Sequence, residues 1–277
     1  MRLATVRHAG RSLFGPVDDT TITDLSGCWA SLADALGDGL EAIAAAAADA
    51  PRVALADVEF DLPIPRPERI LCVGLNYHDH RKESAAAAQA GPRPTIFTRY
   101  RSSLVAQGQP IVRPHVSEIF DYEGELAVVI GRTARYVSAD DALGYVAGYT
   151  IFQDGSVRDY QRHGGQFTPG KNFERSGSCG PWIVTADEFD LGTSTVTTRL
   201  NGQVMQHAPF TDLIFSVGQI IEYCSEFTTL EPGDIIATGT PGGVGYARTP
   251  PVLMQPGDVI EVEIDGIGVL STPVVDE

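Results

Sequence analysis

The sequence predicts an α+β chain that is mainly β, in which a small α/β unit precedes a larger β-rich part. Residues 1–60 contain a hairpin pattern followed by an Ala-rich helical pattern. Residues 62–67, Leu-Pro-Ile-Pro-Arg-Pro, disfavour both a helix and a central strand because every second residue is proline. The rest of the chain holds many short β-rich runs separated by turn signals. We therefore expect a small N-terminal domain over residues 1–65 and a larger domain over residues 66–277.

The N-terminal unit is predicted to be a hairpin followed by one helix. Residues 3–6 and 12–14 flank His-Ala-Gly-Arg, which indicates two strands joined by a turn. Residues 31–50 are Ala-rich, and Pro51 is expected to end a helix there. The larger apolar residues of this stretch recur at helical spacing: Leu32, Leu36, Leu40 and Ile43.

The larger part is predicted to be built from short strands and tight turns. Pro-Gly-Asp occurs at 232–234 and again at 256–258, each time just before a β-rich run, and 265–268 has the composition of a hairpin turn. The predicted strands are 70–73, 95–97, 126–130, 145–152, 183–185, 195–200, 235–237 and 259–264. The bulk of the chain is therefore expected to be β, with helices around it.

Charge and composition exclude several classes of function. The net charge of −16 argues against nucleic-acid binding, and an anionic substrate would need positive charge concentrated locally by a metal ion, Arg or Lys. Residues 1–8 lack the apolar core of a signal peptide, and no later run has the length of a membrane span. The four cysteines are scattered with no Cys-x-x-Cys pair, which indicates buried free thiols. We expect a cytoplasmic protein that does not bind membranes.

The strongest candidate for a metal site is Asp-Tyr-Glu-Gly-Glu at 121–125, which runs directly into an apolar strand pattern. Because successive side chains of a strand alternate between faces, Glu123 and Glu125 should point the same way. Two adjacent carboxylates repel each other unless a cation lies between them, and oxygen ligands suit Mg²⁺, Mn²⁺ or Ca²⁺. Asp154, just after the 145–152 run, is either a turn former or the third ligand. The alternative for the glutamate pair is an edge strand with a solvated acidic face.

A possible general base lies in the segment 78–91. His80 and Glu83 are three residues apart, so a helical turn would let the carboxylate meet the imidazole and the pair could take a proton from water. The alternative is a surface helix of mixed charge. The segment continues into four alanines at 85–88, which have little to bury, so it could move as a lid.

Other polar residues are candidates for substrate contact. Lys171, next to a Pro-Gly turn, would stabilise an enolate or carboxylate in an anionic site and is otherwise solvated. Arg158 and Gln161 would share one face of a helical turn, either in the site or in solvent. The Gly-rich stretch 239–245 lacks the Lys-Ser/Thr of a phosphate loop, so it is either a surface loop or a backbone close to a ligand, with Thr240 as a donor.

In this order, five motifs resemble the fumarylacetoacetate hydrolase family over roughly residues 66 to 275. They are Arg-Ile-Leu-Cys-Val-Gly-Leu-Asn-Tyr at 69–77, the acidic motif with its strand at 121–131, Gly-Lys-Asn-Phe at 170–173, Gly-Pro-Trp-Ile-Val-Thr at 180–185 and Ile-Ala-Thr-Gly-Thr-Pro-Gly-Gly-Val-Gly at 236–245. The resemblance implies a mixed β-sandwich roll as the catalytic domain, preceded here by the small N-terminal domain. It also implies a homodimer.

The resemblance further implies a role for each candidate. It implies that Glu123, Glu125 and Asp154 hold Mg²⁺ or Mn²⁺, with Ca²⁺ possible. His80 and Glu83 would activate water on a lid, and the substrate contacts would be Lys171, Arg158, Gln161 and Thr240. The family commonly has Asn-Asp-Val-Ser-Ala-Arg-Asp where this chain has Gln-Asp-Gly-Ser-Val-Arg-Asp at 153–159. We expect Gly155 to loosen the turn beside Asp154.

The predicted function is metal-dependent hydrolysis of a C–C bond in a 2,4-dioxo acid of the acylpyruvate or fumarylpyruvate kind. Breaking this bond requires a stabilised pyruvate enolate, and the presence of His80 and Glu83 favours a step that uses activated water. The same enolate chemistry would serve a 2-oxo acid decarboxylase, an isomerase or a hydratase. A non-catalytic metal-stabilised binding protein is the alternative of another class. It would keep the carboxylates but lack the dyad or Lys171, and all of these residues are present.

Overall fold

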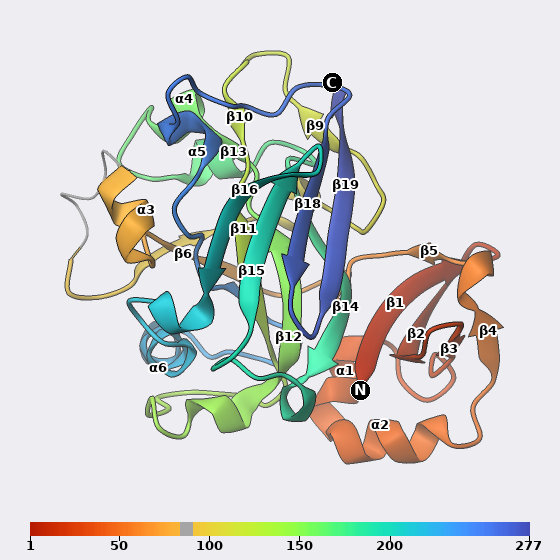
Figure 1. Cartoon of the computed structure of the whole chain (residues 1–277). Coiled ribbons are helices and arrows are strands. Elements are labelled where there is room, and N and C mark those ends of the chain that lie inside the picture. The colour runs from red at the N-terminus through yellow and green to blue at the C-terminus, as the bar shows by residue number, and fades with distance from the viewer. Residues whose placement is uncertain (84–90) are drawn as a thin grey trace.

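The computed structural model describes residues 1–83 and 91–277, and its β-strands form three sheets (Figure 1). The largest sheet has the order β4-β3-β2-β1-β14-β12-β11-β17-β6-β7, with β5 paired to β1 and β8 to β14. Its strands are β1 (Arg2–His8), β2 (Arg11–Val17), β3 (Thr21–Thr23), β4 (Arg52–Ala54), β5 (Glu59–Phe60), β6 (Ile70–Gly74), β7 (Thr95–Thr98), β8 (Leu104–Val105), β11 (Gly124–Ile130), β12 (Val146–Gln153), β14 (Gly177–Thr185) and β17 (Ile235–Ala237).

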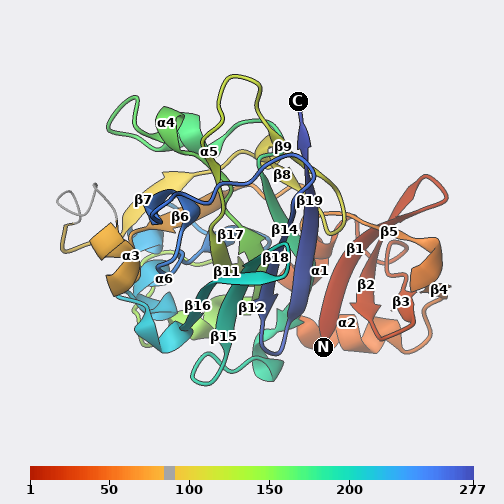
Figure 2. The ribbon, with the colours of Figure 1, turned by 45° about the horizontal axis from the view of Figure 1, so that its top comes forward.

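A second sheet of five strands lies against the first, as Figure 2 shows from a raised viewpoint. Its order is β16-β15-β18-β19-β9, and β10 pairs with β13 separately. These strands are β9 (Ile111–Arg113), β10 (Phe120–Asp121), β13 (Ser156–Val157), β15 (Thr195–Leu200), β16 (Gln203–Pro209), β18 (Val259–Ile264) and β19 (Gly268–Asp276). The α-helices are α1 (Leu32–Asp38), α2 (Leu40–Ala47), α3 (His78–Glu83), α4 (Arg158–Gln161), α5 (Thr168–Lys171) and α6 (Val217–Phe227). The predicted fold class is confirmed.

Strand β11 is the buried centre of this arrangement. Leu126 and Val128 pack in one apolar cluster with residues of β15 and β18. The alternate residues Ala127 and Val129 face the other side and pack in a second cluster with Leu36 of α1. Every residue of β11 is buried, so the strand is a rigid support for Glu125, its second residue, and for Glu123, which directly precedes it.

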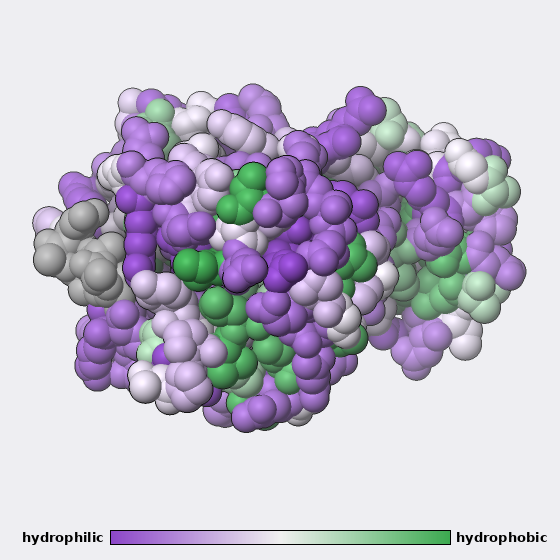
Figure 3. All heavy atoms as spheres, turned by 90° about the horizontal axis from the view of Figure 1, so that it is seen from above, coloured by the Kyte–Doolittle hydropathy of each residue, from purple (hydrophilic) through white to green (hydrophobic). Residues whose placement is uncertain are grey.

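The N-terminal hairpin is confirmed and continues the large sheet. Ala9 and Gly10 form its turn with φ of 47° and 77°, and β1 also pairs with β14, Leu3 opposite Ile183. In the space-filling view these N-terminal elements form the smaller lobe on the right, beside the main body (Figure 3). The division into domains 1–65 and 66–277 stays a prediction.

Two local predictions are wrong. The single helix predicted over 31–50 is two helices, because Gly39 has φ 98°, which breaks the helix between α1 and α2, and α2 ends at Ala47, before Pro51. The cysteines are not all buried, because Cys28 lies in an exposed turn ahead of α1. The eight predicted strands are all present, and four of them are longer than predicted. Among the described helices, none is long and apolar enough to cross a membrane.

Candidate active site

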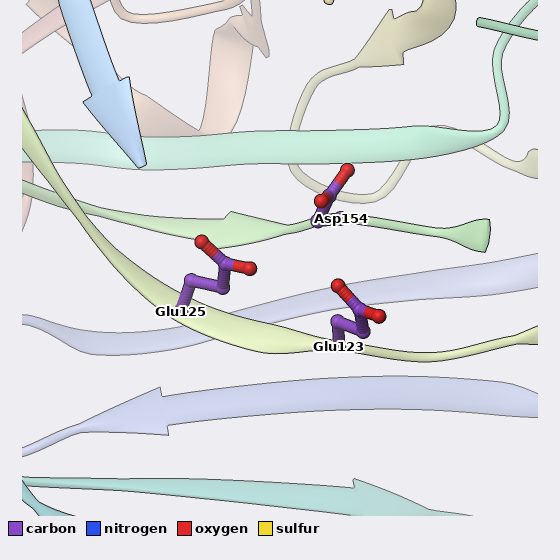
Figure 4. A group of neighbouring side chains, drawn as sticks. All are labelled: Glu123, Glu125 and Asp154. Atoms are coloured by element: carbon purple, nitrogen blue, oxygen red, sulfur yellow. The ribbon is translucent and has the colours of Figure 1, made fainter. Parts of the chain in front are cut away.

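Three carboxylates converge where β11 and β12 lie side by side. Gly124 of β11 pairs with Gln153 of β12, so Glu123 and Asp154, which flank this pair, are neighbours, and the Asp154 N–H donates to the Glu123 carbonyl at 2.8 Å. Glu125 is the second residue of β11 and lies on the same face of the strand as Glu123. One oxygen from each of the three carboxylates lies within 4.8 Å of the others, and the groups point into a shared space (Figure 4). The structure thus brings together the three residues that the sequence suggested as metal ligands.

Buried cations surround two of these carboxylates. The Lys171 ammonium lies 2.7 Å from a Glu123 oxygen and 2.6 Å from an Asp154 oxygen. The Arg158 guanidinium lies 2.5 Å from the other Glu123 oxygen. Although burial alone would raise it, attraction to Lys171 and Arg158 holds the pKa of Glu123 well below its ordinary value. Glu123 is therefore ionised.

Glu125 lacks such a partner. Its carboxylate accepts the Gly239 N–H at 2.8 Å and forms no ion pair with any described residue. Burial, together with repulsion from Asp154 and Glu123, raises the pKa of Glu125 well above its ordinary value. A divalent cation among the three groups would compensate this buried negative charge, and a set made of carboxylate oxygens alone suits a hard ion such as Mg²⁺ or Mn²⁺. The residues therefore fit the metal that the resemblance implies.

The candidate general base lies on a different element. His80 and Glu83 belong to α3 as predicted, and His80 is buried while its Nδ1 has no hydrogen-bond partner among the described residues. The distance from Nδ1 to a Glu83 oxygen is 3.8 Å, too long for a hydrogen bond but short enough for attraction. The Glu83 carboxylate also accepts the Gly243 N–H at 2.8 Å, which ties α3 to the 239–245 loop. The alanines on which the lid prediction depends lie outside the described residues.

One cavity of about 330 Å³ joins these groups. Its wall holds the carboxylates of Glu123 and Glu125 together with the His80–Glu83 pair, and Asp154 lies behind the wall. Phe97 is one of its apolar lining residues. All the other predicted substrate contacts also line it: Arg158, Gln161, Lys171 and Thr240.

Thr240 and Arg158 are held by neighbouring groups. The Thr240 hydroxyl donates to the Gly124 carbonyl at 3.0 Å and accepts from Gln206 at 2.8 Å, so it supports the start of β11 as well as lining the cavity. The Arg158 guanidinium donates to Asp121 and, at 3.1 Å, to the Gln161 side chain, which confirms that Arg158 and Gln161 share one helical face.

The sequence reasoning assigned no role to two charged residues behind the site. Arg99 is buried after β7, and its guanidinium lies 2.5 Å from an Asp154 oxygen. Asp121 is buried and pairs with Arg158 at 2.7 Å while accepting the Gly245 N–H. Nothing in the local sequence marks Arg99, because arginine is usually exposed and its pairing is tertiary. Asp121 belongs to the acidic motif at 121–125, and this position is the sequence signal for its role.

The expectation that Gly155 loosens its turn is wrong. A Cβ at this position would lie 1.8 Å from the carbonyl oxygen of Ser176, so the glycine is required by a close backbone approach. The Gly155 carbonyl also accepts from Arg99 at 3.1 Å. The turn that carries Asp154 is therefore tightly packed.

We predict that Gly155→Ala lowers the free energy of unfolding by about 1–3 kcal/mol, the usual cost of overpacking. The measurement is thermal or urea unfolding of the metal-free protein. Gly27→Ala is the matched control, since a Cβ there meets nothing within 4 Å. Equal stability of the two variants would contradict the close approach.

Comparison with known proteins identifies the family of this chain. A family model described as fumarylacetoacetate (FAA) hydrolase C-terminal matches residues 69–275. The chain is 40% identical over 234 residues to the Bos taurus protein named oxaloacetate tautomerase FAHD2A, mitochondrial, a match covering 83% of this chain and 74% of that protein. It is 42% identical over 224 residues to oxaloacetate tautomerase YisK of Bacillus subtilis (strain 168), with 79% and 74% covered.

A solved structure with the same fold contains a metal. It is maleylpyruvate hydrolase from Sphingobium sp. SYK-6 in complex with manganese (II) ion and pyruvate, which superposes with a TM-score of 0.82 at 32% identity over 100% of this chain and 99% of that one.

Proposed function

Because the chain belongs to the fumarylacetoacetate hydrolase family, we propose that it is a metal-dependent enzyme that interconverts the keto and enol forms of a small 2-oxo acid of the oxaloacetate kind. One observation carries the proposal. Two carboxylates of the cluster, those of Glu123 and Glu125, line the same cavity of about 330 Å³ as Lys171 and the His80–Glu83 pair. The relatives at 40% and 42% identity are named tautomerases, so the isomerase alternative has better support than C–C hydrolysis.

A bound metal would contribute to substrate binding and to charge stabilisation. A divalent cation held by Glu123, Glu125 and Asp154 would polarise the 2-oxo and carboxylate oxygens of the substrate and supply positive charge for the enolate. We propose Mg²⁺ or Mn²⁺, with Ca²⁺ as a further possibility, because all three ligands are carboxylates.

Tautomerisation needs one group that moves a proton at C3 and another that favours negative charge on the oxygen at C2. His80 is placed for the first task, because its imidazole lines the cavity and Glu83 lies 3.8 Å from its Nδ1 to stabilise an imidazolium. Lys171 is placed for the second, because its ammonium borders the carboxylate cluster within the cavity. Arg158 orients the cluster through its contact with Glu123, and Gln161 lines the cavity beside it.

Hydrolysis of an acylpyruvate is the second candidate. The manganese-bound neighbour is named a maleylpyruvate hydrolase, and His80 could equally activate water for attack on a 4-carbonyl. Decarboxylation and hydration would use the same enolate stabilisation. Loss of the dyad or of Lys171 would have favoured the non-catalytic binding protein, but both line the cavity.

The test is a substrate panel with Mg²⁺ and after chelation. The enol and keto forms of oxaloacetate should equilibrate rapidly with enzyme and metal, as followed by ultraviolet absorbance, and chelation should remove the acceleration. Acetylpyruvate and fumarylpyruvate are assayed for cleavage in parallel. Cleavage of a dioxo acid without any effect on oxaloacetate would restore the hydrolase and refute the tautomerase.

We also propose that the protein is a homodimer. Hydrophobic residues gather in the lower centre of the main body in the space-filling view (Figure 3), and β7 and β16 end the described sheets with one edge unpaired. Two-fold pairing is the commonest way to cover such surfaces. Light scattering at micromolar concentration should give twice the chain mass of 29.6 kDa. A monomeric mass would contradict the proposal. A cytoplasmic location stays a prediction from the sequence.

A further inference from the structure

The cavity has a third cation, at its exposed rim, that the proposed chemistry does not use. Arg162 follows Gln161 directly, caps the C-terminus of α4 and is exposed, yet it lines the same cavity as the carboxylate cluster. The cluster itself is buried, with Glu125 only 2% exposed. The wall of the cavity therefore includes both buried carboxylates and an exposed guanidinium.

The charge of Arg162 has no carboxylate partner. Arg158 and Lys171, the other cations of the cavity wall, are each paired with carboxylates of the cluster. Within residues 1–83 and 91–277, Arg162 forms no ion pair, and residues 84–90 contain neither Asp nor Glu. In a chain with a net charge of −16, an uncompensated arginine at the opening of an active-site cavity is a position where an anionic group of a ligand would gain attraction.

Tyr246 holds this guanidinium in place. The Arg162 guanidinium donates to the Tyr246 hydroxyl and lies 4.2 Å from the centre of its ring. The Tyr246 N–H in turn donates to Asp121, which pairs with Arg158, so the tyrosine is anchored to the network behind the cluster. These contacts restrict the Arg162 side chain, so that binding an anion costs less conformational entropy than it would for a freely rotating arginine.

We propose that Arg162, positioned by Tyr246, makes the enzyme select 2-oxo acids that carry a second carboxylate at the end remote from the oxo-acid group. With its 2-oxo acid end at the carboxylate cluster, a substrate would direct its other end toward the rim. A terminal carboxylate would there form a charge-assisted, bidentate contact with the guanidinium, whereas a terminal methyl would not. The inference rests on the proposed function, since it names the substrate class of that same site.

The test compares two ligands that differ only in this group. 2-Oxoglutarate ends in a carboxylate, and 2-oxovalerate, with the same number of carbons, ends in a methyl. Calorimetric titration of the Mg²⁺-loaded wild type should show tighter binding of 2-oxoglutarate. Arg162→Gln should reduce the ratio of the two affinities about tenfold. This is the lower end of the range for a charge-assisted hydrogen bond, because the site is exposed. Arg162→Lys should retain part of it, since the charge remains.

Arg132→Gln is the matched control. Arg132 also lies over a tyrosine ring, that of Tyr145 at 5.1 Å, but it does not line the cavity, so its loss should leave the preference unchanged. A wild type without a preference for 2-oxoglutarate, including one that binds neither ligand, overturns the inference. So does an Arg162→Gln preference equal to that of the wild type.

The outcome is separable from that of the proposed function, which the oxaloacetate assay tests. Oxaloacetate left untouched by a protein whose preference depends on Arg162 would refute tautomerisation alone. Rapid tautomerisation with a preference that Arg162→Gln leaves intact would refute the inference alone.

Discussion

Replacing Glu125 with glutamine should abolish turnover while the protein stays folded. Glu125 is the carboxylate of the cluster that has no cationic side chain as a partner, so its charge is available for the metal. Glutamine keeps an oxygen that can accept the Gly239 N–H but loses the negative charge. We expect the loss of activity to exceed the roughly 10²–10³-fold that removal of a single electrostatic group costs, because the metal would be lost with it.

The same variant should be at least as stable as the wild type when metal is absent. The pKa of Glu125 in the folded protein lies above its ordinary value of 4.5, so the folded state binds more protons than the unfolded state between these two values. The contribution of Glu125 to stability is therefore present below pH 4.5 and is lost as the pH rises toward the raised pKa. Melting curves in chelator should show this loss in the wild type and not in Glu125→Gln.

Metal addition completes this experiment. Mg²⁺ should raise the melting temperature of the wild type at neutral pH, since it binds the folded state and compensates the buried charge, and it should do so far less in Glu125→Gln. Glu118→Gln, at an exposed position upstream of the cluster, is the control and should respond as the wild type does. A Glu125→Gln protein that keeps its turnover and its metal response would remove Glu125 from the metal site.

The sequence predicted those parts of the molecule that local patterns determine. The apolar run at 126–130 indicated a buried strand, and β11 is buried throughout. The spacing of Glu123 and Glu125 placed both on one face of that strand, and the structure shows them converging with Asp154. These features follow from the two-residue period of a strand, which a single sequence reveals.

What the sequence did not show depends on contacts between distant residues. Gly39 interrupts a stretch whose alanines favour helix throughout, and the apolar spacing across the break still matched one helix. The role of Arg99 comes from a partner 55 residues away, Asp154. Gly155 is tightly packed because the backbone of Ser176 lies against it. In the sequence, glycine at this position suggested a looser turn, whereas in the fold it permits a close backbone approach.

Replacing His80 with alanine should reduce turnover by about 10²–10⁴-fold, the usual range for loss of a general acid–base group. His80 is the buried imidazole of the cavity, and Glu83 lies 3.8 Å from its Nδ1, where the carboxylate can stabilise the imidazolium that proton transfer forms. Affinity for oxalate in the presence of Mg²⁺ should change little, because oxalate would engage the metal and the Lys171 side of the cavity. The measurements are steady-state kinetics with oxaloacetate and inhibition by oxalate.

His78→Ala is the control for this variant, since His78 lies on the same helix but is exposed and does not line the cavity. If His80 contributed only to the packing of α3, its loss would alter turnover and oxalate affinity together through the position of the helix. A fall in turnover confined to His80→Ala, at constant oxalate affinity, would instead place the imidazole in proton transfer. Unchanged turnover in His80→Ala would eliminate the dyad. Loss of dioxo-acid cleavage with tautomerisation intact would show that His80 serves water activation alone, and that enolate stabilisation depends on the metal and Lys171.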